Sequence, residues 1–167
     1  DDGVEQYNSA SAQVFGDLKV TVPSLTVGQT VEAVFINPPT GVLSLNLVTG
    51  NGNDVALHFN PRHASTGGLL VLNSLMNGVW ADEVRPAGYP FPFYNVQTRT
   101  TVRITVKEDG FLITVNGINI TTFMYRPGSV TKRFVTSPGK LCQKLFWSQF
   151  KLRTNFEKRH KEANFSS

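Results

Sequence analysis

The sequence has a single cysteine, Cys142, and no long run of apolar residues. One cysteine cannot form a disulfide within the chain, so the cysteine content gives no support to an oxidising compartment. A membrane-spanning helix needs roughly 20 apolar residues in succession, and no segment approaches that length. Because no apolar stretch near the N-terminus follows positive charges, we expect a soluble chain without a signal peptide.

Positive charge is scarce over most of the chain. Residues 1–131 hold seven lysines and arginines against ten aspartates and glutamates, whereas residues 132–167 hold nine against two. The formal net charge of +4 therefore comes from the C-terminal end. We predict a loosely held polar arm over residues 1–13, a folded domain over 14–145 and a basic tail over 146–167.

The residues that are plentiful favour strands and tight turns. Fourteen glycines and nine prolines accompany many Val, Ile, Thr and Phe residues, a composition typical of short strands. Asn116-Gly117 lies between two apolar-rich runs and predicts a two-residue hairpin, because both residues tolerate a positive φ. With no helical segment expected before residue 140, the pattern predicts an all-β sandwich or barrel. The expected strands are Leu18–Val22, Val31–Ile36, Val42–Val48, Val55–Asn60, Leu69–Asn73, Thr100–Lys107, Phe111–Val115 and Ile118–Phe123.

The end of the chain, from Leu141 onward, fits two kinds of secondary structure. Phe146, Phe150, Leu152 and Phe156 share one parity, as in a strand. Leu141, Leu145, Leu152 and Phe156 also fit helical spacing. The pattern does not decide between strand and helix.

A ladder of polar side chains follows one predicted strand. In His58-Phe59-Asn60-Pro61-Arg62, alternate residues of an extended chain share a face and lie about 7 Å apart. His58, Asn60 and Arg62 thus present an imidazole, an amide and a guanidinium, which donate and accept hydrogen bonds in fixed directions. Pairing across residues 50–54 would bring Asn46 beside this ladder. Such a face suits a polyhydroxylated ligand.

A second segment supplies an apolar platform for the same kind of ligand. Trp80 stands three residues before Glu83, and Arg85 follows two residues later. A sugar ring has polar edges and a patch of C–H groups, and a tryptophan face is the usual platform for such a patch. Asn73 lies between the two segments and shares the parity of Val71.

Three separated pieces of the sequence resemble the carbohydrate-recognition signature of the galectins. They are His58-Phe59-Asn60-Pro61-Arg62, Val71-Leu72-Asn73-Ser74 and Trp80-Ala81-Asp82-Glu83-Val84-Arg85, against His-x-Asn-Pro-Arg, Val-x-Asn and Trp-x-x-Glu-x-Arg in the family. The resemblance covers roughly residues 15–135. It implies a jelly-roll β-sandwich of two antiparallel sheets, of the galectin and concanavalin-like kind, with residues 14–145 as the carbohydrate-recognition domain.

The sequence departs from the family pattern at three places. His63 stands where an aromatic residue is usual, and Ala81 stands where glycine is usual. The end of the chain departs most, because galectins close with Gly-Asp and an alternating apolar strand. Here Gly139-Lys140-Leu141-Cys142 runs into the basic tail.

The resemblance implies how galactose would be held. His58, Asn60 and Arg62 would bind the axial C4 hydroxyl, and Arg62 would also reach the ring oxygen. Asn73, together with Glu83, would hold the C6 hydroxyl. Trp80 would stack on the less polar face of the ring.

Other residues would act beyond the galactose ring. Glu83 would join Arg62 and Arg85 in an ion-pair network that contacts the second sugar. Asn46 would extend the groove beyond galactose.

The function that the resemblance implies is that of a non-enzymatic lectin without a cofactor. It would bind β-galactosides of the lactose or N-acetyllactosamine type on glycoproteins and glycolipids, and would cross-link surface glycans as a homo-oligomer. Galectin-like proteins are generally made without a signal sequence, so we expect a cytoplasmic location or an extracellular one reached by non-standard secretion.

Neither catalysis nor a metal site is expected from these residues. A glycosidase needs two carboxylates roughly 5 to 10 Å apart, one of them kept protonated. The cluster supplies Glu83, whose arginine neighbours favour the ionised form. His58 and His63 do not have the spacing of a metal-binding pair.

The alternative function is that of a polyanion-binding or protein-interaction module that acts through the basic tail. Phe146, Trp147 and Phe150 are interleaved with its basic residues, a pattern that can attract nucleic acid, sulfated glycan or acidic lipid. We favour a solvated extension and expect no nucleic-acid partner. Asn119-Ile120-Thr121 and Asn164-Phe165-Ser166 match the glycosylation acceptor pattern.

Overall fold

The structure, a computed structural model, describes residues 25–37, 43–49, 53–62, 68–88 and 98–126, and the backbone of strands 7–22 and 139–155. Regular structure in these residues is all strand, and none of them forms a helix long and apolar enough to cross a membrane. The strands are β1 (Tyr7–Val22), β2 (Thr30–Ile36), β3 (Ser44–Val48), β4 (Val55–Arg62), β5 (Leu69–Met76), β6 (Val79–Trp80), β7 (Arg99–Val106), β8 (Gly110–Val115), β9 (Ile118–Met124) and β10 (Gly139–Asn155).

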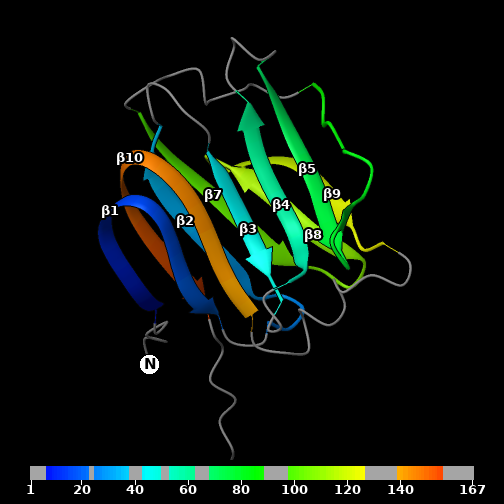
Figure 1. Cartoon of the computed structure of the whole chain (residues 1–167), viewed down its shortest axis with the longest axis horizontal. Helices are drawn as coiled ribbons and strands as arrows, with labels where there is room; N and C mark the ends of the chain where they lie inside the picture. The colour runs from blue at the N-terminus through cyan, green and yellow to red at the C-terminus, as the bar shows by residue number, and fades with distance from the viewer. Residues whose placement is uncertain are drawn as a thin grey trace, which may run out of the picture.

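Two long strands, β1 and β10, join two antiparallel sheets into a sandwich. β10 pairs with β3 over residues 140–144 and with β2 over residues 150–155, while β1 pairs with β10 along both parts. The first sheet has the order β6-β5-β4-β3-β10-β1, and the second has the order β9-β8-β7-β2-β10-β1. In Figure 1, β1 and β10 curve along one side of the molecule from one sheet to the other. The predicted jelly-roll sandwich of two antiparallel sheets is confirmed.

The ends of the chain differ from the expected arm and tail. Residues 7–13, expected in the arm, belong to β1, and residues 146–155, expected in the tail, belong to β10. Each strand supplies the other's backbone hydrogen-bond partners, so a segment without a clear local pattern becomes a strand by long-range pairing. The structure thus decides for strand over helix up to Asn155. Residues 156–167 lie outside the described residues.

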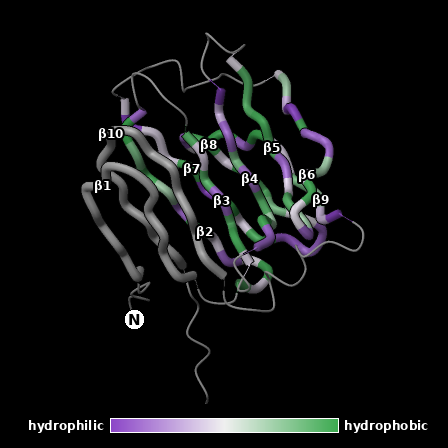
Figure 2. The backbone as a smooth tube through the Cα atoms, viewed as in Figure 1, coloured by the Kyte–Doolittle hydropathy of each residue, from purple (hydrophilic) through white to green (hydrophobic). Residues whose placement is uncertain are grey.

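The hydrophobic core lies between the sheets and follows from the alternation of side chains along the strands. Leu45 and Leu47 of β3 and Leu57 and Phe59 of β4 are at most 1% exposed. The tube in Figure 2 changes between hydrophobic and hydrophilic residues along these strands. Each such buried side chain contributes about 1.5–3 kcal/mol of hydrophobic free energy. Core-facing residues therefore force their neighbours in sequence onto the outer face of the sheet.

Two hairpin turns share the same chemistry. Asn116 and Gly117 have φ values of 49° and 83°, so the predicted Asn-Gly turn between β8 and β9 is confirmed. Asn77 and Gly78 repeat it between β5 and β6, with φ values of 50° and 77°. Asp54 Oδ1 accepts a hydrogen bond of 2.6 Å from the Asn77 backbone amide. This second turn reverses the chain and places Trp80 beside β5.

Candidate functional site

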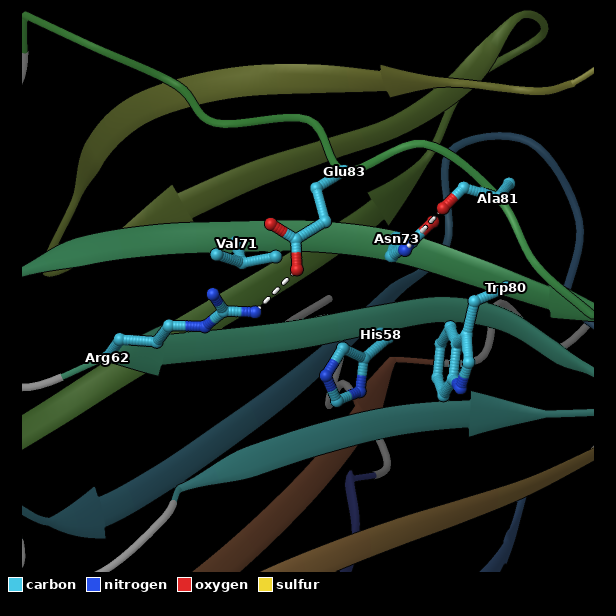
Figure 3. A pocket seen from close by; sticks show the side chains of 7 residues that line it. All are labelled: His58, Arg62, Val71, Asn73, Trp80, Ala81 and Glu83. Carbon is cyan, nitrogen blue, oxygen red and sulfur yellow. Dashed lines mark hydrogen bonds and ion pairs between the residues drawn. The ribbon is translucent and has the colours of Figure 1, made fainter. Parts of the chain in front are cut away.

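A cleft of about 380 Å³ lies on the outer face of β4 and β5. β4 supplies two of its lining side chains, β5 supplies two, and β6 with the segment that follows it supplies three (Figure 3). The lining residues are His58, Arg62, Val71, Asn73, Trp80, Ala81 and Glu83. The three segments singled out in the sequence therefore meet at one place.

Strand register explains why these residues converge. His58 of β4 pairs with Asn46 of β3 on one side and with Asn73 of β5 on the other. Directly opposed residues of an antiparallel pair share a face of the sheet. Val71 joins them because its register partner is Asn60, which has the same parity as His58.

Trp80 forms an apolar wall of the cleft. Its side chain is 49% exposed, and its ring centroid lies 5.0 Å from that of His58 at an interplanar angle of 60°. Figure 3 shows the two rings side by side. A tryptophan half open to solvent at a cleft offers its ring to the C–H groups of a ligand.

The opposite wall is an ion-pair network centred on Glu83. Arg62 Nη2 donates to Glu83 Oε1 over 2.5 Å, and Arg85 donates to Oε2 through Nη2 over 2.6 Å and through Nε over 3.0 Å. Hydrogen bonds from Arg85, and next from Arg62, hold the pKa of the Glu83 carboxyl below its ordinary value. An exposed ion pair contributes only about 0–1 kcal/mol to stability. The main consequence is therefore that a charged acceptor and a charged donor have fixed positions in the cleft.

His58 carries a free hydrogen-bond acceptor in its neutral form. His58 Nδ1 lies 2.5 Å from Asn46 Oδ1. An amide oxygen can only accept, so Nδ1 carries the proton and Nε2 keeps its lone pair. Burial lowers the pKa of His58, the positive charge of Arg62 lowers it further, and Glu83 opposes this to a smaller extent. The imidazole is therefore neutral at pH 7.

Three of the eight predicted site residues contact lining side chains and do not line the cleft themselves. Asn60 is 8% exposed, donates through Nδ2 to the Leu43 carbonyl over 2.7 Å, and accepts from Arg62 Nε over 3.3 Å. Asn46 contacts His58, and Arg85 contacts Glu83. In this structure these residues orient the imidazole, the guanidinium and the carboxylate.

Asn73 lines the cleft and also fixes the segment after Trp80. Its Nδ2 donates to the Ala81 carbonyl over 2.8 Å, and its Oδ1 accepts from the Ser74 amide over 2.8 Å. The Ala81 amide donates to the Ser74 carbonyl over 3.1 Å. Leu72 and Val84 form a further bridge with two backbone hydrogen bonds of 2.9 and 2.8 Å. The chain that carries Glu83 is thus held along β5.

Sequence reasoning missed two lining residues and one tether. Val71 and Ala81 line the cleft, and the parity of Val71 was the available signal for the first. The tether is Arg126, beyond the end of β9, which donates through Nη2 to the Asp82 carbonyl. Its guanidinium also lies 5.5 Å from the ring centroid of Phe123. No local pattern predicts a contact between residues 44 positions apart.

The sequence model of the galactoside-binding lectins matches residues 18–140, most of the chain. This chain belongs to the galectin family. It is 33% identical to galectin-6 of Mus musculus over 96 residues, which are 55% of this chain and 29% of that protein. It is 33% identical to human galectin-4 over 108 residues, 61% of this chain and 31% of that protein. The chain thus spans about a third or less of the length of these relatives.

Solved galectin structures share the fold. A tetrameric galectin from the ball sponge Cinachyrella sp. superposes with a TM-score of 0.66 at 28% identity, covering 84% of this chain and 99% of that one. The Caenorhabditis elegans galectin LEC-6 superposes with a TM-score of 0.67 at 21% identity, covering 89% of this chain and 96% of that one. The second likeness shows the fold alone.

The structure accommodates two of the three departures from the galectin pattern, at Ala81 and at the closing strand. Ala81 has no positive φ, so alanine fits without strain where the family has glycine. The closing strand exists as β10, despite the altered sequence at Gly139 to Cys142. His63 lies outside the described residues.

Proposed function

We propose that this galectin is a non-enzymatic lectin that binds β-galactosides in the cleft between His58, Trp80 and Glu83. The observation that carries the proposal is the arrangement of one cleft with an apolar ring on one wall and an ion-paired arginine and glutamate on the other. A galactose ring needs both, because one of its faces is largely C–H and its edges are hydroxyls.

The polar groups suit an axial C4 hydroxyl. His58 Nε2 can accept its proton, while the Arg62 guanidinium, fixed by Asn60 and Glu83, can donate to its oxygen. Glu83, with Asn73, can hold the C6 hydroxyl. A sugar with an equatorial C4 hydroxyl would give neither the Nε2 atom of His58 nor the free N–H groups of Arg62 a partner on the sugar, and each missing hydrogen bond to a buried group costs about 1–3 kcal/mol.

A single site should bind its sugar weakly, so we expect the protein to act through several sites linked together. Each hydrogen bond to a sugar replaces one to water and contributes about 0.5–1.5 kcal/mol, so a disaccharide should bind with a Kd on the order of micromolar to millimolar. Useful avidity then requires several linked sites. The related sponge galectin is tetrameric, and we extend this to a homo-oligomer that cross-links lactose- or N-acetyllactosamine-bearing glycoproteins and glycolipids outside the cell.

Hydrolysis of the bound sugar is not part of the proposal. Glu83 is the one carboxylate among the residues that line the described cleft. Its arginine partners keep it ionised, whereas a general acid must be protonated.

Titration of the full chain with lactose and with cellobiose tests the proposal. The two disaccharides differ only in the C4 configuration of the non-reducing sugar, so they form a matched pair. We expect calorimetry to show lactose binding and at least about tenfold weaker cellobiose binding, equivalent to about 1.4 kcal/mol. Equal affinity for both sugars, or no lactose binding at millimolar concentration, would contradict it.

The pH dependence of lactose affinity should report the protonation of His58. Because the pKa of His58 is lowered, we expect constant affinity from about pH 8 to pH 6.5. Below that range, protonation removes the Nε2 acceptor, and affinity should fall as the pH falls. Glu83 stays ionised over this range because its pKa is also lowered. Calorimetry down to about pH 5 checks the prediction, and an unchanged affinity would show that His58 is not the acceptor.

A further inference from the structure

The turn that leads into Trp80 carries a chemically reactive pair of residues. An asparagine followed by glycine can lose its side-chain amide without an enzyme, because glycine has no side chain to hinder ring closure. The sequence has three such pairs, Asn51-Gly52, Asn77-Gly78 and Asn116-Gly117. The first lies outside the described residues. The other two form hairpin turns, between β5 and β6 and between β8 and β9.

The two described turns have nearly the same backbone shape and surroundings. Asn77 and Asn116 have φ values of 50° and 49°, and the glycines that follow them have values of 77° and 83°. All four residues are exposed. Apart from its chain neighbours, a Cβ atom at either glycine would meet no atom within 4 Å. Neither access to water nor room for ring closure therefore distinguishes the two asparagines.

The hydrogen bonds of the two side chains do distinguish them. Asn116 Oδ1 accepts from the backbone amide of Thr101 on β7 over 2.8 Å. Asn77 instead bonds through its backbone amide, which donates to Asp54 Oδ1 over 2.6 Å. The side-chain amide of Asn77 has no hydrogen-bond partner in the part of the chain that the structure describes. It can therefore rotate toward the Gly78 nitrogen without breaking a bond.

Deamidation begins when the backbone nitrogen of Gly78 attacks Cγ of Asn77. The nitrogen loses its proton, and the Cγ–Nδ2 bond breaks, so that the side-chain nitrogen leaves as ammonia. Solvent water then opens the five-membered imide at one of its two carbonyls. One opening gives aspartate. The other gives isoaspartate, in which the main chain runs through the former side chain and is longer by one carbon atom.

The turn at Asn77 fixes the place of Trp80. β6 consists of Val79 and Trp80, and both pair with the end of β5 directly across the turn. A two-residue turn joins its strands through a fixed number of main-chain atoms, so the extra atom of isoaspartate displaces β6. Trp80 would then leave its place beside the ring of His58, where the two centroids are 5.0 Å apart.

The charge that deamidation adds acts on the same turn. The residue that accepts from the Asn77 backbone amide is Asp54, which is only 5% exposed. Cγ of Asn77 is three bonds from that amide nitrogen, so a carboxylate there lies within about 7 Å of the Asp54 carboxyl. Two negative charges at this distance repel each other. The aspartate product therefore weakens the turn as well.

We propose that Asn77 is a site of spontaneous deamidation, and that this modification lowers the sugar affinity of the protein by displacing Trp80. The first statement stands on the two turns alone, whereas the second rests on the proposed galactoside function. Sugar binding would therefore decline with the age of the molecule.

Incubation of the full chain at physiological temperature and mildly alkaline pH tests the modification. Peptide mass spectrometry at intervals separates the asparagine, aspartate and isoaspartate forms of each turn. We expect Asn77 to deamidate about three- to tenfold faster than Asn116, because the Asn116 side chain must first break its hydrogen bond to Thr101. Equal rates, or faster deamidation of Asn116, would overturn the proposed site.

Calorimetry with lactose on fresh and aged protein tests the consequence for binding. Affinity should fall as the fraction modified at Asn77 rises, with an unchanged circular dichroism spectrum. Asn77→Gly lacks the amide and tolerates the positive φ, so it should bind lactose as the fresh chain does and keep its affinity on ageing. An equal decline in Asn77→Gly, or full affinity in a chain modified at Asn77, would overturn the effect on binding.

A matched pair of substitutions isolates the added charge. Asn77→Asp should bind lactose about two- to fivefold more weakly even when fresh, because of repulsion from Asp54. Asn116→Asp places the same charge in the matching turn of the second sheet and should bind as the unaltered chain does. Equal affinities of the two variants would contradict the role of this repulsion. A fresh unaltered chain that binds no lactose would instead overturn the galactoside function, while the mass spectra would still decide the site of deamidation.

Discussion

Replacing Trp80 with alanine is expected to abolish retention of the chain on immobilised lactose. The indole is half exposed and supplies the apolar wall of the cleft. Losing an aromatic platform should cost about 2–3 kcal/mol of binding, a factor of about 30 to 150 in Kd. Because the site is weak to begin with, the remaining affinity should fall below detection. Trp80→Phe should keep part of the affinity, because a smaller ring remains.

The same experiment separates loss of binding from loss of fold. Trp80 is outside the buried cluster that forms the core, so circular dichroism and the melting temperature should be almost unchanged. Val79→Ala is the matched control, because Val79 precedes Trp80 on β6, is 69% exposed and does not line the cleft. It should bind lactose as the unaltered chain does. Full retention of Trp80→Ala on the column would rule out the proposed platform.

Replacing Arg62 with alanine should weaken lactose binding about 10- to 150-fold. Hydrogen bonds to charged groups contribute about 1.5–3 kcal/mol, and Glu83 would also lose one of the two donors that orient it. Arg62→Lys should restore little of this, because lysine keeps the charge but lacks the planar fork that contacts Asn60 and Glu83 together. Titration calorimetry with lactose gives the three affinities.

Arg103 provides a matched control for the Arg62 variants. Arg103 Nε contacts Glu32 Oε2 over 2.6 Å on the second sheet, and its side chain is 56% exposed. Arg103→Ala therefore removes an arginine–glutamate pair away from the cleft, in which the Glu32 side chain is 13% exposed. Arg62→Ala should change the free energy of unfolding by only about 0–1 kcal/mol, and only Arg62→Ala should change binding. An equal loss of lactose affinity in both variants would mean that Arg62 acts through the overall charge of the protein and not through contacts in the cleft.

Short-range patterns in the chain were enough to predict most of the strands, while the jelly-roll arrangement was implied by the family resemblance. Alternation along segments such as Val31–Ile36 produced strands, since a half-buried strand with period two buries one face. Asn116-Gly117 formed the expected turn because its φ values require residues that tolerate the left-handed region. Both effects act within a few residues, so they can be read from the chain directly.

The residues of the candidate site were predicted as a set, but not their individual positions. The alternation along the strand predicted that His58, Asn60 and Arg62 lie on one face of the sheet, and the strand register of the structure confirms this. Parity cannot say that Asn60 turns toward the Leu43 carbonyl, since that acceptor lies 17 residues away in the chain, just before β3. The galactoside-binding role of each residue stays a prediction.

Long-range pairing determined what the local pattern left open. Residues 7–13 and 146–155 became strands because β1 and β10 satisfy each other's backbone hydrogen bonds over most of their length. The same pairing places Lys151 and Arg153, which composition had assigned to a separate basic tail, within β10 beside β2. The residue types therefore set the local conformation and the chemistry available. Contacts between segments far apart in the chain set which groups meet, because hydrogen-bond partners and packing surfaces exist only once the sheets have assembled.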